Sequence, residues 1–157
     1  MKPFFKNRQK LITACVGVVA ILALLLPFAF AKPATATLQA GKKTYALNIA
    51  ASTAAQQKGL GGRKSLARNR GMLFVFDAPA TQCFWMKDMQ FPIDIIWLNS
   101  DKQVTRVAAN VSPDTYTEAP GKNPQKFCGD VSTKYVIELN AGEAKQAGLV
   151  VGQPVSL

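Results

Sequence analysis

The chain has 157 residues, enough for one domain and a short appendage, and it contains no histidine, which excludes Ser-His-Asp catalysis, Cys-His catalysis and histidine-dependent metal sites. The net charge is +10, and residues 32–157 carry +6 of it because four basic residues and no acidic residue lie in 1–31. A basic domain of this kind suits an anionic partner, but no motif of a nucleic-acid-binding module, a metal site or a cofactor site is present.

Residues 1–31 are predicted to direct the chain to a membrane. Basic residues within 1–10 precede Leu11–Ala31, an uncharged span whose helix would be about 31 Å long, enough to cross a bilayer core of roughly 30 Å. The segment Ala29–Ala31 resembles a signal-peptide cleavage site, so the span is either a retained anchor or a cleaved signal peptide. The basic flank predicts an exported domain in both cases. The domain would be held outside the cytoplasmic membrane by the anchor, or would be periplasmic or secreted after cleavage behind Ala31.

The next segment is predicted to be a linker followed by three short elements. Residues 32–42 begin with proline and small residues and are typical of a linker. Apolar and polar residues alternate over Lys43–Ile49, which predicts a strand. A short helix is predicted over Ala54–Lys58, and it should end at Gly59. The continuous apolar run Met72–Phe76 is too short for a helix and predicts a buried strand.

The stretch Cys83–Asn99 contains both tryptophans and the most informative charged residue of the chain. It includes two strand-length apolar runs, Cys83–Met86 and Ile93–Leu98, which are rich in aromatic and β-branched residues. Asp94 lies within the second run, between two isoleucines. An ionised carboxylate is costly to bury unless it has a partner, so Asp94 is expected to lie beside a cation.

The second half of the chain predicts further strands separated by turns. Strands are predicted over Gln103–Ala109, Lys134–Leu139 and Val150–Leu157, and a helix over Ala141–Ala147. Residues 110–132 are rich in proline and glycine and predict a long loop. Several short strands joined by turns predict a mainly β fold for residues 43–157, a compact barrel or sandwich with two short helices behind the N-terminal hydrophobic helix.

Cys83 and Cys128 lie in the predicted exported part, whereas Cys15 lies in the hydrophobic span. An even pair of cysteines in an oxidising compartment is typical of a disulfide. A bond between them would tie the long loop to the central stretch, and it would remove roughly 4 kcal/mol of unfolded-state entropy in the chain-entropy model. The alternative is a reactive thiol, which would lack a neighbouring histidine to activate it.

Five segments together resemble a known family. In chain order they are GLGGRKSL, GMLFVF, CFWMKDMQFPIDIIWL, YVIELNAGEA and GLVVGQPV. On these segments the chain is identified as a member of the family called domain of unknown function 192, or uncharacterised protein family 0127, over about residues 43–157. The chain departs from the family pattern at Gly61, where the family has methionine, and at Asp88 and Met89, where the family commonly has Asn-Thr. The resemblance implies a compact β domain, often exported, and it implies no established activity.

The candidate ligand site combines aromatic and charged side chains. The residues are Arg63, Trp85, Lys87, Asp94 and Glu138. The two acids lie within apolar strands, and Arg63 and Lys87 are the cations that could accompany them. An aromatic wall formed by Trp85 and its neighbours, together with polar groups, suits a sugar or another small amphipathic molecule. The sequence therefore predicts an envelope binding module for a small polar or saccharide-like ligand.

Three other interpretations stay open at the level of sequence. Asp94 and Glu138 could act as the paired carboxylates of a hydrolase if they face one cleft about 5–9 Å apart, although two acids in a β domain are a weak signal for an enzyme. The charged residues could instead form an internal ion-pair network that fixes the fold. The domain could also be a structural envelope protein that recruits an anionic component through its basic surface.

Overall fold

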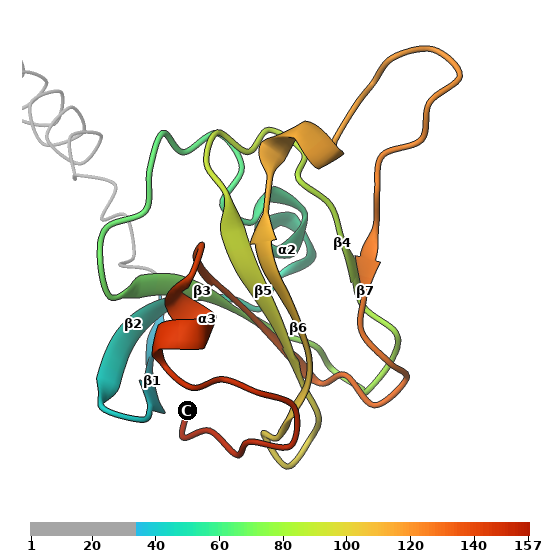
Figure 1. The fold of residues 1–157 in the computed structure, drawn as a ribbon. Coiled ribbons are helices and arrows are strands. Elements are labelled where there is room, and N and C mark those ends of the chain that lie inside the picture. Colours follow the sequence, from blue (N-terminus) through green and yellow to red (C-terminus); the bar gives the residue numbers. More distant parts are fainter. Residues whose placement is uncertain (1–33) are drawn as a thin grey trace, which may run out of the picture. The chain divides into compact units, whose positions relative to one another are not determined.

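The structure is a computed structural model, and it describes residues 34–157 (Figure 1). The predicted span Leu11–Ala31 and its cleavage site lie outside the described residues. Within residues 34–157, no helix has both the length and the apolar character needed to cross a membrane.

A mixed sheet of six strands forms the body of the domain (Figure 1). In chain order its strands are β1 (Thr35–Ala40), β2 (Lys43–Ala50), β3 (Arg70–Val75), β5 (Ile93–Leu98), β6 (Val104–Val111) and β8 (Tyr135–Asn140). Their order across the sheet is β1-β2-β3-β8-β5-β6. Strands β2 and β3 pair in parallel, and the other neighbouring strands pair antiparallel. The late strand β8 therefore lies between β3 and β5 in the middle of the sheet.

The remaining elements are short. They are α2 (Thr53–Lys58), the strand β4 (Cys83–Phe84), the 3₁₀ turn η1 (Pro113–Thr115), the strand β7 (Phe127–Cys128) and α3 (Glu143–Gln146). Strands β4 and β7 pair as a separate two-stranded sheet. Helix α2 lies in the crossover from β2 to β3. It begins after Ser52, whose side chain accepts a hydrogen bond from Ala55 N, and it ends at Gly59, whose φ is +51°, as predicted.

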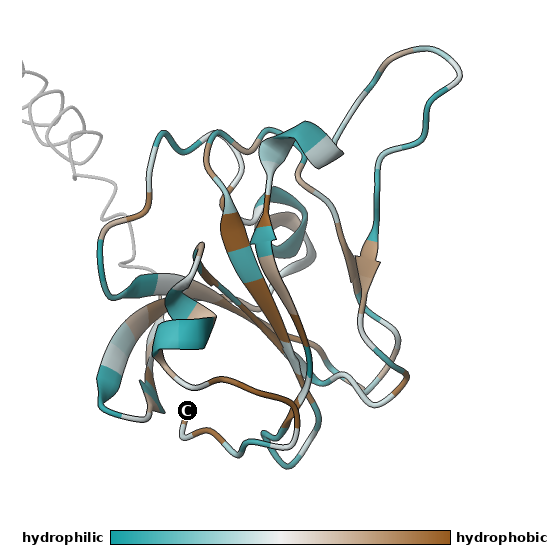
Figure 2. Ribbon diagram, viewed as in Figure 1, coloured by the Kyte–Doolittle hydropathy of each residue, from teal (hydrophilic) through white to brown (hydrophobic). Residues whose placement is uncertain are grey.

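The central strands β3, β8 and β5 are buried on both faces of the sheet, which explains their continuous apolar runs. Every residue of β5 is buried, and its alternate side chains enter two different cores. One core contains Tyr45 and Ile96, and the other contains Phe74 and Trp97. In Figure 2 the ribbon of β5 is coloured mainly as hydrophobic and carries one hydrophilic band. The predicted mainly β fold with two short helices is confirmed.

Three segments differ in kind or extent from the sequence prediction, and several strand ends differ by one or two residues. Residues 32–42, expected to be a linker, contain β1, which pairs with β2 along its whole length. Its alternate residues Leu38 and Ala40 are buried, so tertiary packing outweighs the weak strand signal. The predicted strand Cys83–Met86 is limited to β4, and the helix expected over Ala141–Ala147 is limited to α3.

The C-terminal segment is also not the regular strand that Val150–Leu157 predicts. It contributes two isolated bridges, from Ser156 to Gln39 and from Pro154 to Gln103. A proline without an N–H cannot donate to a sheet ladder, and Gly152 has a φ of +86°, so a continuous strand is interrupted here. The segment thereby forms one bridge to the edge strand β1 and one to the residue before the other edge strand, β6.

Candidate functional site

Glu138 is a buried carboxylate in the middle of the sheet. It lies on β8 opposite Met72 of β3 and Ile95 of β5. The residue is 5% exposed, and its Oε2 atom has no hydrogen-bond partner. A buried polar atom without a partner is costly, so this oxygen is exceptional in a folded domain.

Burial raises the pKa of Glu138 to about 8, although the positive charge of Arg63 acts in the opposite direction. Arg63 follows the turn at Gly59–Gly62 and is half-buried. Within residues 34–157 it forms no ion pair with Glu138, so its influence acts through space. The Glu138 carboxyl group is therefore mainly protonated at neutral pH.

Glu138 lines a cavity of about 230 Å³. Rings from two strands and the adjoining loop form its apolar walls, and amides and two lysines supply the polar atoms. The apolar lining includes Leu60, Phe74, Phe76, Phe84, Trp85 and Met89. The polar lining, apart from Glu138, includes Gln56, Gln57, Lys58, Gln82 and Lys87. An apolar cavity with a few convergent polar groups is the usual form of a small-molecule site.

The aromatic wall is held in place by ring packing. Phe74 and Phe84 meet edge to face with ring centroids 4.8 Å apart, and Trp97 packs behind Phe84 at 6.2 Å. Trp85 is 47% exposed, and the Lys126 ammonium lies 5.5 Å from its ring centroid. The wall thus passes from a buried Phe74 to a solvent-accessible Trp85.

The cavity opens onto a wider surface groove. The cavity and the groove share Lys58, Gly61, Trp85 and Lys87 among their lining residues, whereas Glu138 lines the cavity and not the groove. The lysines therefore lie at the mouth and the carboxylate at the closed end. The Lys87 ammonium lies 3.7 Å from an exposed carboxylate oxygen of Glu118, a surface pair that contributes little to stability.

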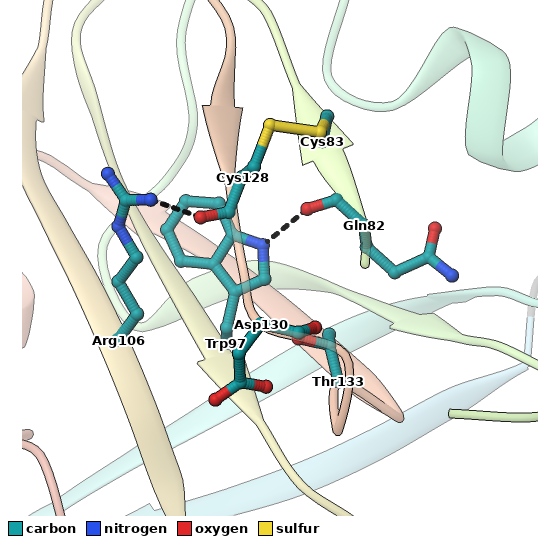
Figure 3. Close-up of a disulfide and its surroundings, with 7 residues drawn as sticks. All are labelled: Gln82, Cys83, Trp97, Arg106, Cys128, Asp130 and Thr133. Atoms are coloured by element: carbon teal, nitrogen blue, oxygen red, sulfur yellow. Dashed lines mark hydrogen bonds between the residues drawn. A yellow bond between two sulfur atoms is a disulfide. The ribbon is translucent and has the colours of Figure 1, made fainter. Parts of the chain in front are cut away.

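A disulfide supports one side of this wall (Figure 3). Cys83 and Cys128 lie directly opposite each other in the β4–β7 pair and are bonded, which confirms the predicted pairing. Trp97 lies beside the bond, and its Nε1 atom donates to the Gln82 carbonyl at 2.9 Å. Arg106 donates to the Cys128 carbonyl, and its guanidinium carbon lies 5.3 Å from the Trp97 ring centroid. Because Cys83 also lines the cavity, the disulfide and the site form one unit.

Asp94 is placed elsewhere and has different partners from those expected. It is fully buried, and its two oxygens accept hydrogen bonds from Asn110 N and Ala144 N, both at 2.8 Å. The expectation of a neighbouring cation is wrong, because backbone amides satisfy this carboxylate. Asp94 thereby ties β5 to the end of β6 and to α3.

The structure brings together part of the predicted set. Trp85, Lys87 and Glu138 line one cavity, and Arg63 lies close enough to influence the Glu138 carboxyl group. Asp94 lies on the other side of the sheet. Trp97 is core rather than wall. Among residues 34–157, no group of three or more acidic or cysteine side chains is arranged to hold a metal ion.

Sequence reasoning missed Lys58 and Phe74. Lys58 is the last residue of helix α2, immediately before Gly59, and both residues line the cavity. Phe74 lies two residues after Met72 along β3, on the same face of the strand, and both belong to the core that contains Trp97. The alternation of side chains along β3 could have placed Phe74 on the cavity face. No local sequence pattern predicts where α2 lies, so none could have placed Lys58 at the cavity.

The fold and site define a class: a disulfide-bonded β domain with a small cavity around a buried carboxylate. The chain belongs to the DUF192 family, described as Uncharacterized ACR, COG1430, whose model matches residues 35–157. The family resemblance found in the sequence is thereby confirmed. No curated protein matches the chain.

Two solved structures are similar to this chain. A protein of unknown function from Novosphingobium aromaticivorans DSM 12444 has 26% identity and a TM-score of 0.67, covering 82% of this chain and 94% of that one. A protein from Sinorhizobium meliloti 1021, described as a proposed transcription regulator, has 25% identity and a TM-score of 0.69, covering 80% of this chain and 95% of that one. Both similarities extend over nearly the whole of the other protein.

Proposed function

We propose that this domain is a binding module for a small polar ligand, held in the cavity between Glu138 and Trp85. One observation carries the proposal: the unpartnered Oε2 atom of Glu138 at the closed end of an aromatic-walled cavity. A bound donor would supply the hydrogen bond that the protein leaves out. Trp85 would cover the outer part of the ligand, as aromatic rings do in sites for amphipathic molecules.

The geometry favours binding over a purely structural network. A structural network of buried charges would pair Glu138 with Arg63 or Lys87, because an unpaired buried charge is destabilising. Instead Lys87 contacts the exposed Glu118, and Arg63 forms no ion pair in the described part of the chain. An unpaired carboxyl group inside an accessible cavity therefore supports a ligand-binding site over a structural network.

The paired-carboxylate hydrolase loses its geometric basis. In the β5–β8 ladder Asp94 is opposite Leu139, whereas Glu138 is opposite Ile95. Side chains of directly opposed residues share a face, and successive residues alternate between faces. The two carboxylates therefore point to opposite sides of the sheet and cannot act on one bond. A structural envelope protein has no specific observation in its favour.

We also place the binding module outside the cytoplasm. The Cys83–Cys128 disulfide supports an oxidising compartment, because such bonds are rare in cytosolic proteins. The basic, hydrophobic N-terminal sequence supports export with either a retained anchor or cleavage after Ala31. A topology assay on cells with an alkaline phosphatase fusion after Leu157 should report activity, and an inactive fusion would contradict export.

Tryptophan fluorescence offers a direct test of ligand binding, because Trp85 at the cavity and the buried Trp97 are the only tryptophans of the chain. The purified full-length protein in mild detergent would be titrated with N-acetylglucosamine, glucose, L-phenylalanine, L-leucine and citrate. We expect a saturable change with at least one compound, and we expect Trp85→Phe to remove it.

Lys87→Ala and the control Lys64→Ala separate a site from a surface effect. Lys87 lines the cavity, whereas Lys64 is exposed and outside it. Binding should weaken at least fivefold in Lys87→Ala with an almost unchanged melting temperature, and it should be unaffected in Lys64→Ala. A response that survives Trp85→Phe and Lys87→Ala would refute a site in this cavity.

A further inference from the structure

Acidic and basic side chains that line the cavity lie at different ends of it. Glu138 is the single carboxylate among the lining residues and lies at the closed end. Lys58 and Lys87 line both the cavity and the groove outside it. A ligand that fills the cavity therefore meets a carboxyl group at the closed end and the side chains of two lysines toward the mouth. Asp88 lines the groove outside the cavity, and the exposed Glu118 lies 3.7 Å from the Lys87 ammonium.

Resting on the proposed binding function, we propose that the ligand is a small zwitterionic amino-carboxylate, such as a single amino acid. Its ammonium group contacts Glu138 at the closed end, and its carboxylate contacts Lys58 and Lys87 at the mouth.

An ammonium group is the donor that fits the inner end best. It brings a full positive charge to Glu138 Oε2, and a charge-assisted hydrogen bond is about twice as strong as a neutral one. The Phe74 ring lines the cavity and, like Glu138 Oε2, lies next to Gly59, so it can face a cation at this end. A sugar hydroxyl would supply a neutral hydrogen bond to the protonated carboxyl group, without the charge-assisted contact that an ammonium group forms with the ionised one.

The lysines at the mouth argue against a simple amine. An amine without a negative group would enter the cavity past the ammonium groups of Lys58 and Lys87 and would remain near them when bound. Arg63 adds a third positive charge near Glu138. A ligand carboxylate at the mouth converts that repulsion into attraction. The zwitterion is the charge pattern that satisfies both ends together.

The cavity volume limits the part of a ligand that can lie inside it. About 230 Å³ is below the roughly 300–1,000 Å³ of pockets for drug-sized ligands. An amino acid with an apolar side chain fits this space and could contact the rings. An oligosaccharide or a long peptide does not fit inside it.

Binding of an ammonium group should release a proton. Burial keeps Glu138 protonated near neutral pH, and a bound cation favours its ionised form, so the carboxyl proton passes to the solvent. The other charged side chains near the cavity and its mouth are Arg63, Lys58, Lys87 and Asp88. Isothermal titration calorimetry in buffers with different ionisation enthalpies measures this release directly.

Matched ligands separate the two ends of the proposed contact. L-phenylalanine would be compared with 3-phenylpropionate, which lacks the ammonium group, and with phenethylamine, which lacks the carboxylate; L-leucine, 4-methylpentanoate and isoamylamine form a second series. We expect at least one amino acid to bind, and each of its two truncated analogues to bind at least tenfold more weakly. Proton release should accompany binding of the amino acids and of any amine that binds, and it should be absent for the carboxylate analogues, which have no ammonium group.

Variants assign the two ends to residues. Glu138→Gln should weaken the amino acid at least tenfold, abolish the proton release and leave the affinity for the carboxylate analogue unchanged. The double change Lys58→Ala and Lys87→Ala should weaken the amino acid and leave phenethylamine unchanged or tighter. Asp101→Asn and Lys64→Ala alter exposed charges outside the cavity and should change nothing.

The outcomes distinguish this inference from the proposed function. If N-acetylglucosamine or glucose binds with a Trp85-dependent signal and no amino acid does, the binding function stands and the zwitterion is refuted. Equal affinity for an amino acid and either truncated analogue also refutes the zwitterion. If none of these compounds binds at 10 mM, both proposals fail.

Discussion

Asp94 and Glu138 lie in neighbouring strands, one residue out of register, and their carboxylates point to opposite faces of the same sheet. Asp94 is satisfied by two backbone amides, whereas Glu138 Oε2 has no partner. Two buried acids with similar sequence surroundings thus have opposite roles. One joins elements of the fold, and the other lines the cavity in which we propose that a ligand binds.

Asp94→Asn should destabilise the domain. An asparagine side chain of the same size has one acceptor oxygen and one NH₂ group, so one of the two backbone amides at Asn110 and Ala144 would face a donor. Losing a charge-assisted hydrogen bond and leaving a buried N–H unpaired should cost about 2–4 kcal/mol of unfolding free energy. Urea unfolding followed by circular dichroism measures this loss.

Asp101→Asn is the matched control, because Asp101 is exposed in the turn between β5 and β6. Its unfolding free energy should stay within about 0.5 kcal/mol of the unmodified protein. An Asp94→Asn variant as stable as the control would contradict the bridging role of Asp94.

Glu138 should give the domain a distinctive pH dependence. Its pKa is raised from 4.5 to about 8 in the folded state, so the folded chain keeps a proton that the unfolded chain has lost. The unfolding free energy should therefore fall as the pH rises from about 4.5 to about 8, by up to about 1.4 kcal/mol per pH unit, and this contribution should level off above pH 8.

The difference between the unmodified protein and Glu138→Gln isolates this group, because the other titrating groups are common to both. Urea unfolding at pH 5, 6.5 and 8 should show the variant gaining on the unmodified protein at each step. A difference that is independent of pH would contradict a buried, proton-binding Glu138.

Local pattern predicted the strands with strong signals. The run Ile93–Leu98 matches β5 at both ends, because an apolar, β-branched segment with both faces buried needs little context. Strand β1 was missed because its sequence, TATLQA, is weakly apolar, and its pairing with β2 decides its structure. The last segment was overpredicted because Val150 and Val151, although strand formers, are exposed.

Pattern also identified buried charges but not their partners. Asp94 and Glu138 were singled out because each interrupts an apolar run. Which face each occupies depends on register, and which groups meet it depends on strands far apart in the sequence. Lys58 reaches the cavity only because the β2–β3 crossover places α2 there. A single sequence carries no signal for such a placement.

The disulfide should stabilise both the fold and the cavity wall. Replacing Cys83 and Cys128 together by serine should lower the unfolding free energy by about 2–5 kcal/mol, as removal of a native disulfide usually does in a small domain. Because Cys83 and its neighbour Phe84 line the cavity, the affinity for any ligand identified should also fall.

Cys15→Ser is the control for this change, since Cys15 does not take part in the bond. Unfolding and ligand titration of the two proteins should separate clearly. If the Cys83/Cys128 variant matches Cys15→Ser in stability, the bond does not contribute to the fold as argued.

Glu143 should produce the opposite pH effect from Glu138. Hydrogen bonds from Lys43 and from the buried Tyr45 hydroxyl, both 2.7 Å to Oε2, lower the pKa of Glu143. The stability contributed by the ionised form is therefore present above the ordinary glutamate pKa of about 4.5 and is lost as the pH falls through the lower folded value. Glu143→Gln keeps the side-chain shape and an acceptor for Tyr45 but removes the charge. At pH 7 it should cost about 1 kcal/mol of unfolding free energy, and the cost should shrink toward zero on acidification.

Glu118→Gln is the comparison, because its exposed pair with Lys87 at 3.7 Å should contribute nothing measurable at either pH. A Glu143→Gln cost that persists at pH 2.5, or an equal cost in Glu118→Gln, would show that the ionised clamp between β2 and α3 does not stabilise the domain.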